Sequence, residues 1–174
     1  MYIHRIETTA EKAFDICSKI IDKEDALWIQ LSLSGEYATG DLQKLVELCN
    51  ERQIFLVVEN DLTLLEDIKC HGIHLTNSNL HPAQIREKLG AEPIIGCNVL
   101  TPTEVLSLKS ADIDYVTLPS GKDCEWYKNF SSQVKNAKVD IHLVAEIESF
   151  NADLIDSLIE AGIDGVVINT QNYE

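Results

Sequence analysis

The sequence contains little positive charge. Its 174 residues include 14 lysines and arginines against 29 aspartates and glutamates, so the net charge is −15 at pH 7. Nucleic acids and anionic membranes select for basic patches on their protein partners. The charge therefore argues against both classes of partner and is typical of an acidic protein surface, and we expect a cytoplasmic protein.

Long hydrophobic runs are also absent. No stretch approaches the roughly 20 apolar residues of a membrane-spanning helix, and the N-terminal MYIHRIETT lacks the apolar segment of a signal peptide. The sequence contains no linker, low-complexity tract or shift in composition either. A chain of 174 residues can bury one full core, so we expect residues 1–174 to form a single domain.

The cysteines show no pattern typical of a metal or redox site. There are five of them, widely scattered, and no CxxC motif occurs. Cys17 and Cys49 fall on the apolar faces of expected helices, which indicates core-filling thiols in a reducing compartment. A catalytic cysteine needs a neighbouring base or a helix N-terminus. That test leaves Cys97 and Cys124 open, but we expect neither a nucleophile nor a zinc site.

What the sequence does contain is a repeated strand–helix unit. Short apolar runs at Ile54–Val58, Gly72–Leu75 and Pro93–Val99 alternate with helical patterns at Leu62–Cys70 and Pro82–Leu89. Apolar strands that alternate with helices predict a parallel sheet covered by helices. In closed sheets of this kind, functional side chains collect at the carboxyl ends of the strands.

The same unit extends to both ends of the chain. The further expected strands are Tyr2–Ile6, Ala26–Leu33, Asp114–Leu118, Ile141–Ile147 and Gly165–Asn169. The further expected helices run from Thr8 to about Asp22, over Asp41–Arg52, from Thr101, over Glu125–Asn136 and over Asn151–Ala161. Eight strands alternating with seven helices predict an α/β protein, a short (β/α)8 TIM barrel that lacks its eighth helix.

Capping residues support several of the expected helix ends. Thr8-Thr9-Ala10-Glu11 and Thr101-Pro102-Thr103-Glu104 both match a capping box, in which a threonine and a glutamate satisfy backbone N–H groups at a helix start. Gly72, Gly90 and Gly162 stand where helices should end, because glycine adopts a left-handed backbone without steric cost.

A missing eighth helix would leave the seam between the last and first strands uncovered. Val166 and Ile168 face outward in the last strand, and we expect both to be partly exposed. Exposed apolar surface usually marks an association site. We therefore predict a homodimer that covers this seam.

Strand alternation identifies the side chains that point into the barrel. In ALWIQLSLS every second residue is apolar and must face the helices, so Gln30 and Ser32 point inward. In DIHLVAEIE the same argument turns Glu146 inward. The barrel mouth should hold further polar groups beside one cation, Lys122. These groups are Glu59, Asn60, Asp61, His74, Asn98, Thr117 and Asn169.

Several of these side chains also have a purely structural interpretation. Gln30 and Asn98 could bond to barrel backbone or to buried water, and His74 could be a satisfied core histidine. Asp61 could simply cap the helix that follows it. An inward Glu146 is costly unless it is paired or hydrated, and an ion pair with the lysine at the mouth would explain it.

At these positions the chain resembles the thiamine-phosphate synthase family and its relatives, the thiazole tautomerases. The family pattern has Q-x-R-x-K on strand two, Asn-Asp after strand three, G-[VI]-H-L-G-Q-x-D on strand four and I-[IL]-G-x-S on strand five. Here IQLSLS, VENDL, GIHLTNSN and IIGCN stand in those places, in order and at similar spacing. DYVTLP and GIDGVVIN resemble family strands six and eight. The resemblance implies a role in or near thiamine biosynthesis.

The resemblance also implies the site of an active synthase. Enzymes of the family join a pyrimidine pyrophosphate to a thiazole phosphate in a dissociative step, which requires cations for the pyrophosphate and aspartates for magnesium. Gln30, Asn60 and Asp61 match family positions for pyrimidine, for pyrophosphate or pyrimidine, and for metal. Lys122 is the candidate for the loop lysine, and magnesium at Asp61 is the implied cofactor.

Other positions depart from the family pattern. Ser32 and Ser34 replace a basic pair, Asn79 replaces the second magnesium aspartate and Asn98 replaces a serine. A Gly-Gly phosphate cradle after strand seven becomes Ala145-Glu146. Because a carboxylate repels phosphate, these changes favour a divergent member that has lost the synthase reaction.

The resulting hypothesis is a barrel that binds a small neutral or cationic molecule of pyrimidine or thiazole type. If the protein is an enzyme, Glu146 and Lys122 are the catalytic candidates. The expected substrate-binding residues are Gln30, Ser32, Asn60, His74, Asn98 and Asn169. The alternatives are an active thiamine-phosphate synthase and a non-catalytic small-molecule-binding or scaffolding protein.

Overall fold

Eight parallel strands close into a barrel in the computed structural model, which describes residues 1–23, 28–37, 39–76 and 81–170. The strands pair in sequence order, and β8 pairs with β1. They are β1 (Tyr2–Thr9), β2 (Trp28–Ser34), β3 (Phe55–Glu59), β4 (Gly72–Leu75), β5 (Ile94–Asn98), β6 (Tyr115–Leu118), β7 (His142–Ile147) and β8 (Gly165–Asn169). The predicted (β/α)8 topology is confirmed.

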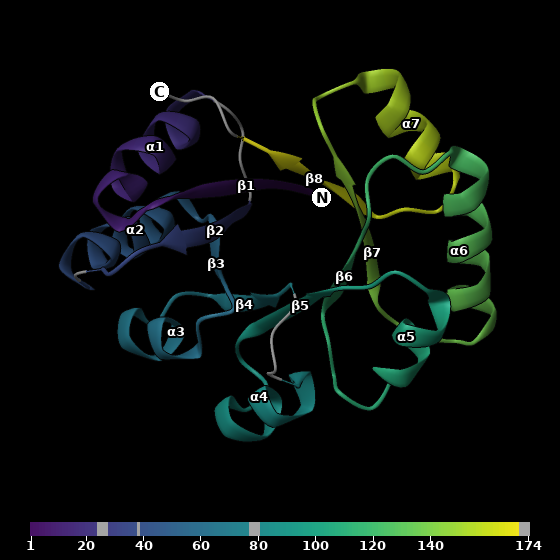
Figure 1. The fold of residues 1–174 in the computed structure, drawn as a ribbon, viewed down its shortest axis with the longest axis horizontal. Coiled ribbons are helices and arrows are strands. Elements are labelled where there is room, and N and C mark those ends of the chain that lie inside the picture. Colours follow the sequence, from purple (N-terminus) through teal and green to yellow (C-terminus); the bar gives the residue numbers. More distant parts are fainter. Residues whose placement is uncertain (24–27, 38, 77–80, 171–174) are drawn as a thin grey trace.

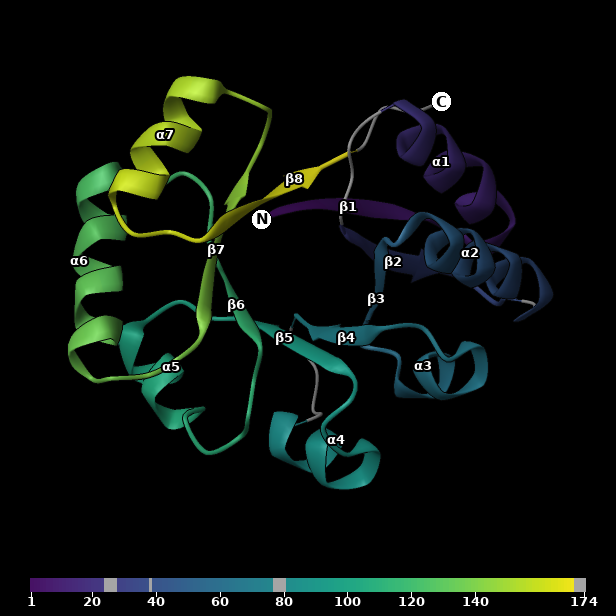
Figure 2. The ribbon, with the colours of Figure 1, turned by 180° about the vertical axis from the view of Figure 1, so that it is seen from behind.

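Seven helices in the described part of the chain alternate with the strands and lie outside the barrel (Figure 1; Figure 2). They are α1 (Ala10–Lys23), α2 (Thr39–Arg52), α3 (Leu62–Ile68), α4 (Pro82–Leu89), α5 (Pro102–Ser107), α6 (Cys124–Asn136) and α7 (Ala152–Glu160). Among the described residues no helix follows β8, as predicted. None of the described helices is long and apolar enough to cross a membrane.

The main core lies between the outer face of the barrel and the helices. Ile29 and Leu31 of β2 belong to this core, together with Leu45 of α2. Gln30 lies between the two β2 residues but points into the barrel, where it bonds to Glu59. The alternation predicted for β2 is therefore confirmed.

Part of the barrel interior is filled by a second, smaller apolar cluster. Ile3, Tyr115, Val144 and Val167 pack together there, and each is almost inaccessible. Gly96 of β5 is opposite Tyr115 of β6, and a Cβ atom at residue 96 would collide with the tyrosine ring. Gly96 thus leaves the space that the Tyr115 ring occupies.

Some helix ends follow the predicted caps and others do not. Thr101 caps α5 in a capping box with Glu104, and Gly90 follows α4 with a φ of 76°. The capping box predicted at Thr8 is wrong, because Thr8 lies within β1 and α1 begins only at Ala10. In this case the pairing of β1 with β2 extends the strand through the residues that could have capped the helix.

Gly72 does not end a helix, contrary to the prediction. The preceding helix ends at Ile68, and Lys69 is its left-handed C-cap with a φ of 52°. Gly72 lies inside β4, where a Cβ atom would collide with the backbone of Ile94 on β5. Its small size allows the close approach of two strands. Gly162, by contrast, does take a left-handed backbone after α7, with a φ of 87°.

The seam between β8 and β1 is better covered than predicted. Val166 is only 2% exposed and lines a small cavity together with Ile155 of α7, so the predicted exposure of Val166 is wrong. Ile168 is partly exposed, as expected. Tyr2 and Phe150 are exposed nearby, with their rings stacked 6.4 Å apart. The homodimer stays a prediction.

Gly96→Ala is expected to lower the free energy of unfolding by about 1–3 kcal/mol, the usual cost of overpacking. The new methyl group meets the Tyr115 ring, which Trp28 holds in an edge-on contact with a centroid distance of 5.5 Å. Gly40→Ala is the matched control, because residue 40 lies in α2 with open space around it and alanine favours helix. Urea denaturation measures both. A Gly96→Ala protein as stable as the parent would contradict this account of the barrel interior.

Candidate functional site

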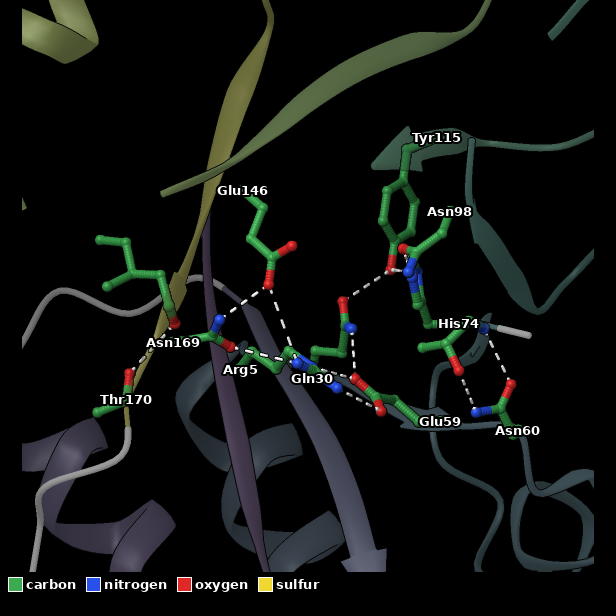
Figure 3. A network of polar contacts seen from close by, with 12 residues as sticks. Arg5, Gln30, Glu59, Asn60, His74, Asn98, Tyr115, Glu146, Asn169 and Thr170 are labelled. Atoms are coloured by element: carbon green, nitrogen blue, oxygen red, sulfur yellow. Dashed lines mark hydrogen bonds and ion pairs between the residues drawn. The ribbon is translucent and has the colours of Figure 1, made fainter. Parts of the chain in front are cut away.

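Polar side chains from all eight strands meet at one end of the barrel (Figure 3). We call them the mouth network: Arg5, Gln30, Glu59, His74, Asn98, Tyr115, Glu146 and Asn169. The register of the parallel strands places these residues at similar heights along the barrel. Arg5 is opposite both Gln30 and Asn169, and Glu59 is opposite His74. The network therefore follows directly from the register of the closed sheet.

A buried ion pair lies at the centre of the mouth network. Arg5 donates to both carboxylate oxygens of Glu59, from Nε to Oε1 at 2.5 Å and from Nη2 to Oε2 at 3.1 Å. Gln30 Nε2 also donates to Glu59 Oε1, at 2.7 Å. The Glu59 side chain is only 3% exposed and that of Arg5 is 25% exposed. A bidentate arginine and an amide donor hold the buried carboxylate in one orientation.

These contacts keep Glu59 ionised. Burial alone raises the pKa of the Glu59 carboxyl group, but hydrogen bonds from Arg5 and Gln30, with the charge of Arg5, outweigh burial. The pKa of Glu59 therefore lies below its usual value, and a hydrogen bond from Ser32 acts in the same direction. The hydrogen bond to Glu59 likewise raises the pKa of Arg5, so the pair is charged at neutral pH.

Glu146 joins the network from β7. Its Oε1 accepts from Asn169 Nδ2 at 2.8 Å and lies 3.9 Å from Arg5 Nη1. Asn169 Oδ1 in turn accepts from Arg5 Nη1 at 3.4 Å. Lys122, proposed from the sequence as the ion-pair partner of Glu146, instead places its Nζ 5.8 Å from the centre of the Trp126 ring. Arg5 is therefore the cation that two carboxylates share.

His74 is fully buried and neutral. Its Nε2 lies 2.8 Å from Asn98 Oδ1, and its Nδ1 lies 3.0 Å from the Tyr115 hydroxyl. Burial lowers the pKa of His74 to about 4, so the ring carries one proton at neutral pH. Because the amide oxygen of Asn98 only accepts, Nε2 donates to it and Nδ1 accepts from Tyr115. His74 thus has the contacts of a satisfied core histidine, and it fixes the orientation of Asn98.

Thr117 carries a buried hydroxyl group that has no partner in the described part of the chain. It is opposite Asn98 in the sheet, and only 6% of the residue is exposed. An unsatisfied buried hydroxyl costs roughly 1–3 kcal/mol. The protein is therefore less stable with threonine at position 117 than it would be with valine, which has the same shape but no hydroxyl group.

The side chains of Asn60 and Asp61 make their contacts outside the mouth network, although the backbone N–H of Asn60 donates to His74 O at 2.9 Å. Asn60 joins two loops, because its Nδ2 donates to Thr76 Oγ1 at 2.6 Å and its Oδ1 accepts from Thr76 N at 2.9 Å. Asp61 caps α3 by accepting from Leu64 N at 2.8 Å. Its other oxygen accepts from the Tyr37 hydroxyl, also at 2.8 Å. The capping interpretation of Asp61 thus matches the structure.

The described residues do not fit a magnesium ion at Asp61. Both carboxylate oxygens of Asp61 already have protein donors. No group of three His, Cys, Asp or Glu side chains within the described ranges could hold a metal ion. Asn79, at the family's second aspartate position, lies outside the described residues. In this structure Asp61 is a helix cap.

The structure brings together part of the predicted site. Gln30, His74, Asn98, Glu146 and Asn169 belong to one network, and Ser32 contributes to the lowered pKa of Glu59. The remaining predicted residues, Asn60, Asp61 and Lys122, make their contacts elsewhere.

Sequence reasoning missed Arg5 and Tyr115. Alternation in YIHRIETT places Arg5 on the same face as Ile3, which lies in the barrel interior. Alternation in DYVTLP places Tyr115 on the same face as Thr117. A cation on the inner face of a strand needs a buried carboxylate nearby, and that requirement was the signal that could have identified the pair.

Comparisons with known proteins show which family the sequence matches. Residues 5–171 match the family model described as thiamine monophosphate synthase. A thiamine biosynthesis bifunctional protein of Geobacter sulfurreducens is 29% identical over 136 residues, which cover 72% of this chain and 26% of that protein. A thiamine-phosphate synthase of Bacteroides thetaiotaomicron is 26% identical over 157 residues, 82% of this chain and 75% of the relative.

A solved structure shows the same fold. Thiamine phosphate pyrophosphorylase from Pyrococcus furiosus superposes with a TM-score of 0.74 at 18% sequence identity. The superposition covers 96% of this chain and 85% of that protein. At this identity the likeness concerns the barrel itself and leaves the chemistry of the mouth to be argued from its residues.

Thr117→Val is expected to raise the free energy of unfolding by about 1 kcal/mol, because it removes an unsatisfied hydroxyl group and keeps the shape of the side chain. Thr101→Val is the matched control. It should lower the free energy of unfolding by about 1 kcal/mol, since the Thr101 hydroxyl accepts from Glu104 N at the start of α5. Urea denaturation at neutral pH compares them, and a destabilised Thr117→Val protein would show that the hydroxyl has a partner.

Glu59→Gln is expected to lower the free energy of unfolding by about 3–5 kcal/mol, because it leaves the charge of Arg5 without its buried partner. In the parent protein the stabilisation by the pair is complete above the usual carboxyl pKa of 4.5. It is lost as pH falls through the lower pKa of folded Glu59. The difference between the two proteins should therefore shrink from neutral pH to about pH 3. A series of urea denaturations would reject this if the difference were independent of pH.

Proposed function

The chain belongs to the thiamine monophosphate synthase family, and from this premise we propose that it is a divergent member whose barrel mouth binds a small neutral or cationic molecule. The proposal includes the loss of the reaction that joins a pyrimidine pyrophosphate to a thiazole phosphate. One observation carries it: Arg5, the cation of the mouth network, is already paired with Glu59 and faces a second carboxylate, Glu146.

A pyrophosphate would meet unfavourable charges at this mouth. Each charge-assisted contact to a phosphate is worth about 1.5–3 kcal/mol, but the charge of Arg5 is already compensated by Glu59, which a phosphate would have to displace as its partner. Breaking a buried pair costs about 3–5 kcal/mol. Glu146 adds repulsion, and the serines at positions 32 and 34 are uncharged. The balance therefore disfavours an anion.

An uncharged or cationic ring with hydrogen-bonding groups suits the mouth better. Asn98, Asn169 and Glu146 remain at least partly exposed, whereas both ring nitrogens of His74 already have partners. We assign ligand contact to the three exposed side chains and a positioning role to His74. The two amides can donate and accept, and the carboxylate accepts from an amino group.

Glu146 is the group assigned to any proton transfer with the ligand. It borders the mouth and, as a carboxylate, can serve either as counter-charge or as general base. Lys122 is not assigned this role, because its ammonium group contacts the Trp126 ring.

Hydroxymethylpyrimidine or the corresponding thiazole alcohol is expected to raise the melting temperature of the protein, because neither carries an anionic group. Hydroxymethylpyrimidine pyrophosphate with magnesium should cause no shift and no calorimetric signal at ~1 mM ligand, the weak end of specific binding. Thermal-shift and calorimetric titrations provide the measurement. Asn98→Ala should abolish the shift by the alcohol, while Gly40→Ala on α2 should retain it.

The charge argument has its own control. Glu146→Gly removes the repulsive carboxylate and one of the two acidic neighbours of Arg5, so it should bind inorganic pyrophosphate more tightly than the parent protein does. Magnesium-dependent binding of hydroxymethylpyrimidine pyrophosphate by the parent protein would instead favour an active synthase and end the proposal.

A further inference from the structure

A cleft of about 290 Å³ opens beside the mouth network, between the loop that precedes α6, the end of β7 and the helix α7. Figure 1 shows α6 and α7 next to each other on the side of the barrel near β7. The volume is at the lower end of the range for small-molecule sites, roughly 300–1,000 Å³. The cleft can therefore take a ligand with about one ring.

The cleft combines an apolar floor with an acidic rim. Tyr127 and Leu158 are buried and Leu154 is half-buried, and all three line the cleft. Glu146 and Glu148 line it as well, and Glu146 is partly exposed whereas Glu148 is exposed. Tyr127 is fixed by a hydrogen bond from its hydroxyl to Pro119 O at 2.7 Å. The cleft thus places two carboxylates beside apolar side chains, of which Tyr127 is held in place by a hydrogen bond.

Glu146 connects this cleft to the mouth network. One of its oxygens accepts from Asn169 and lies near Arg5. In Figure 3 the other oxygen points away from both residues. Lys122 also lines the cleft, but its ammonium group lies over the Trp126 ring. The carboxylates of the rim therefore outnumber its cations, and one carboxylate oxygen is available to a donor.

We propose that the cleft binds the ammonium group of an organic amine at Glu146, with the apolar body of the amine on Tyr127, Leu154 and Leu158. The inference rests on the proposed function, because it specifies the ligand class that one side of the same site recognises. A carboxylate next to an apolar floor loses hydration when the floor is covered, and a cation with N–H donors compensates that loss. A carboxylate or phosphate ligand would meet repulsion there.

A metal ion fits the cleft less well than an amine. Magnesium and calcium require about six to eight oxygen ligands, whereas much of this cleft is lined by apolar side chains. A neutral ligand of the same shape would contact the apolar floor but would not form an ion pair with Glu146. The comparison of matched cation, neutral molecule and anion is therefore the direct test.

The experiment is an NMR titration of the ¹⁵N-labelled protein with benzylammonium, benzyl alcohol and benzoate. Benzylammonium is expected to shift the amide signals of residues 146–151 and of Tyr127. It should bind at least about ten times more tightly than benzyl alcohol, as a charge-assisted hydrogen bond implies. Benzoate should leave these signals unchanged. Glu146→Gln should reduce the affinity for benzylammonium to that for benzyl alcohol, while Glu87→Gln, the same charge change on α4, should not.

Two outcomes would overturn the inference. One is binding of benzoate or benzyl alcohol as tightly as benzylammonium, and the other is an unchanged preference for the cation in Glu146→Gln. Both outcomes are measured with the benzyl ligands, whereas the proposed function is tested by titrating the parent protein and Asn98→Ala with the pyrimidine and thiazole alcohols. If the parent protein binds the pyrimidine or thiazole alcohol but does not prefer benzylammonium, only the cleft assignment is rejected. If it prefers benzylammonium but binds neither the pyrimidine nor the thiazole alcohol, the proposed function is rejected.

Discussion

The Arg5–Glu59 ion pair is the interaction on which the polar interior of the barrel depends. It joins β1 to β3 and holds Gln30 of the intervening strand in place. Neither charge is tolerable alone in this position, because an unpaired buried ion is strongly destabilising. The pair uses two of the five N–H donors of Arg5, and a third donates to Asn169. Because Glu59 compensates the charge of Arg5, the second carboxylate, Glu146, gives the mouth its negative character.

The barrel and its mouth are specified by different residues. The closed sheet is stabilised by apolar residues that face the helices, such as Ile29 and Leu31. The mouth is composed of the residues that alternate with them, such as Gln30 and Glu146. Substitutions on the inner face can therefore change the charge of the site while the outer face preserves the fold. A shared barrel with different chemistry is the expected result.

The predictable features are those with a signal that is local in the sequence. The alternation of β2 and the capping box at Thr101 need only neighbouring residues, and both were predicted correctly. Position 72 requires glycine because the backbone of Ile94 on another strand lies too close for a side chain. Arg5, and not Lys122, forms the ion pair with Glu146 because β1 pairs with β8. Such features depend on how distant segments meet, which alternation and capping do not reveal.

The packing of Gly96 against Tyr115 has an evolutionary consequence. Because the ring leaves no room for a side chain at residue 96, enlargement there requires a smaller residue at 115, and the two positions should show strong epistasis. A smaller residue at 115 would also deprive His74 of its hydroxyl donor. The contacts of a buried histidine therefore depend on a glycine that has no functional group of its own.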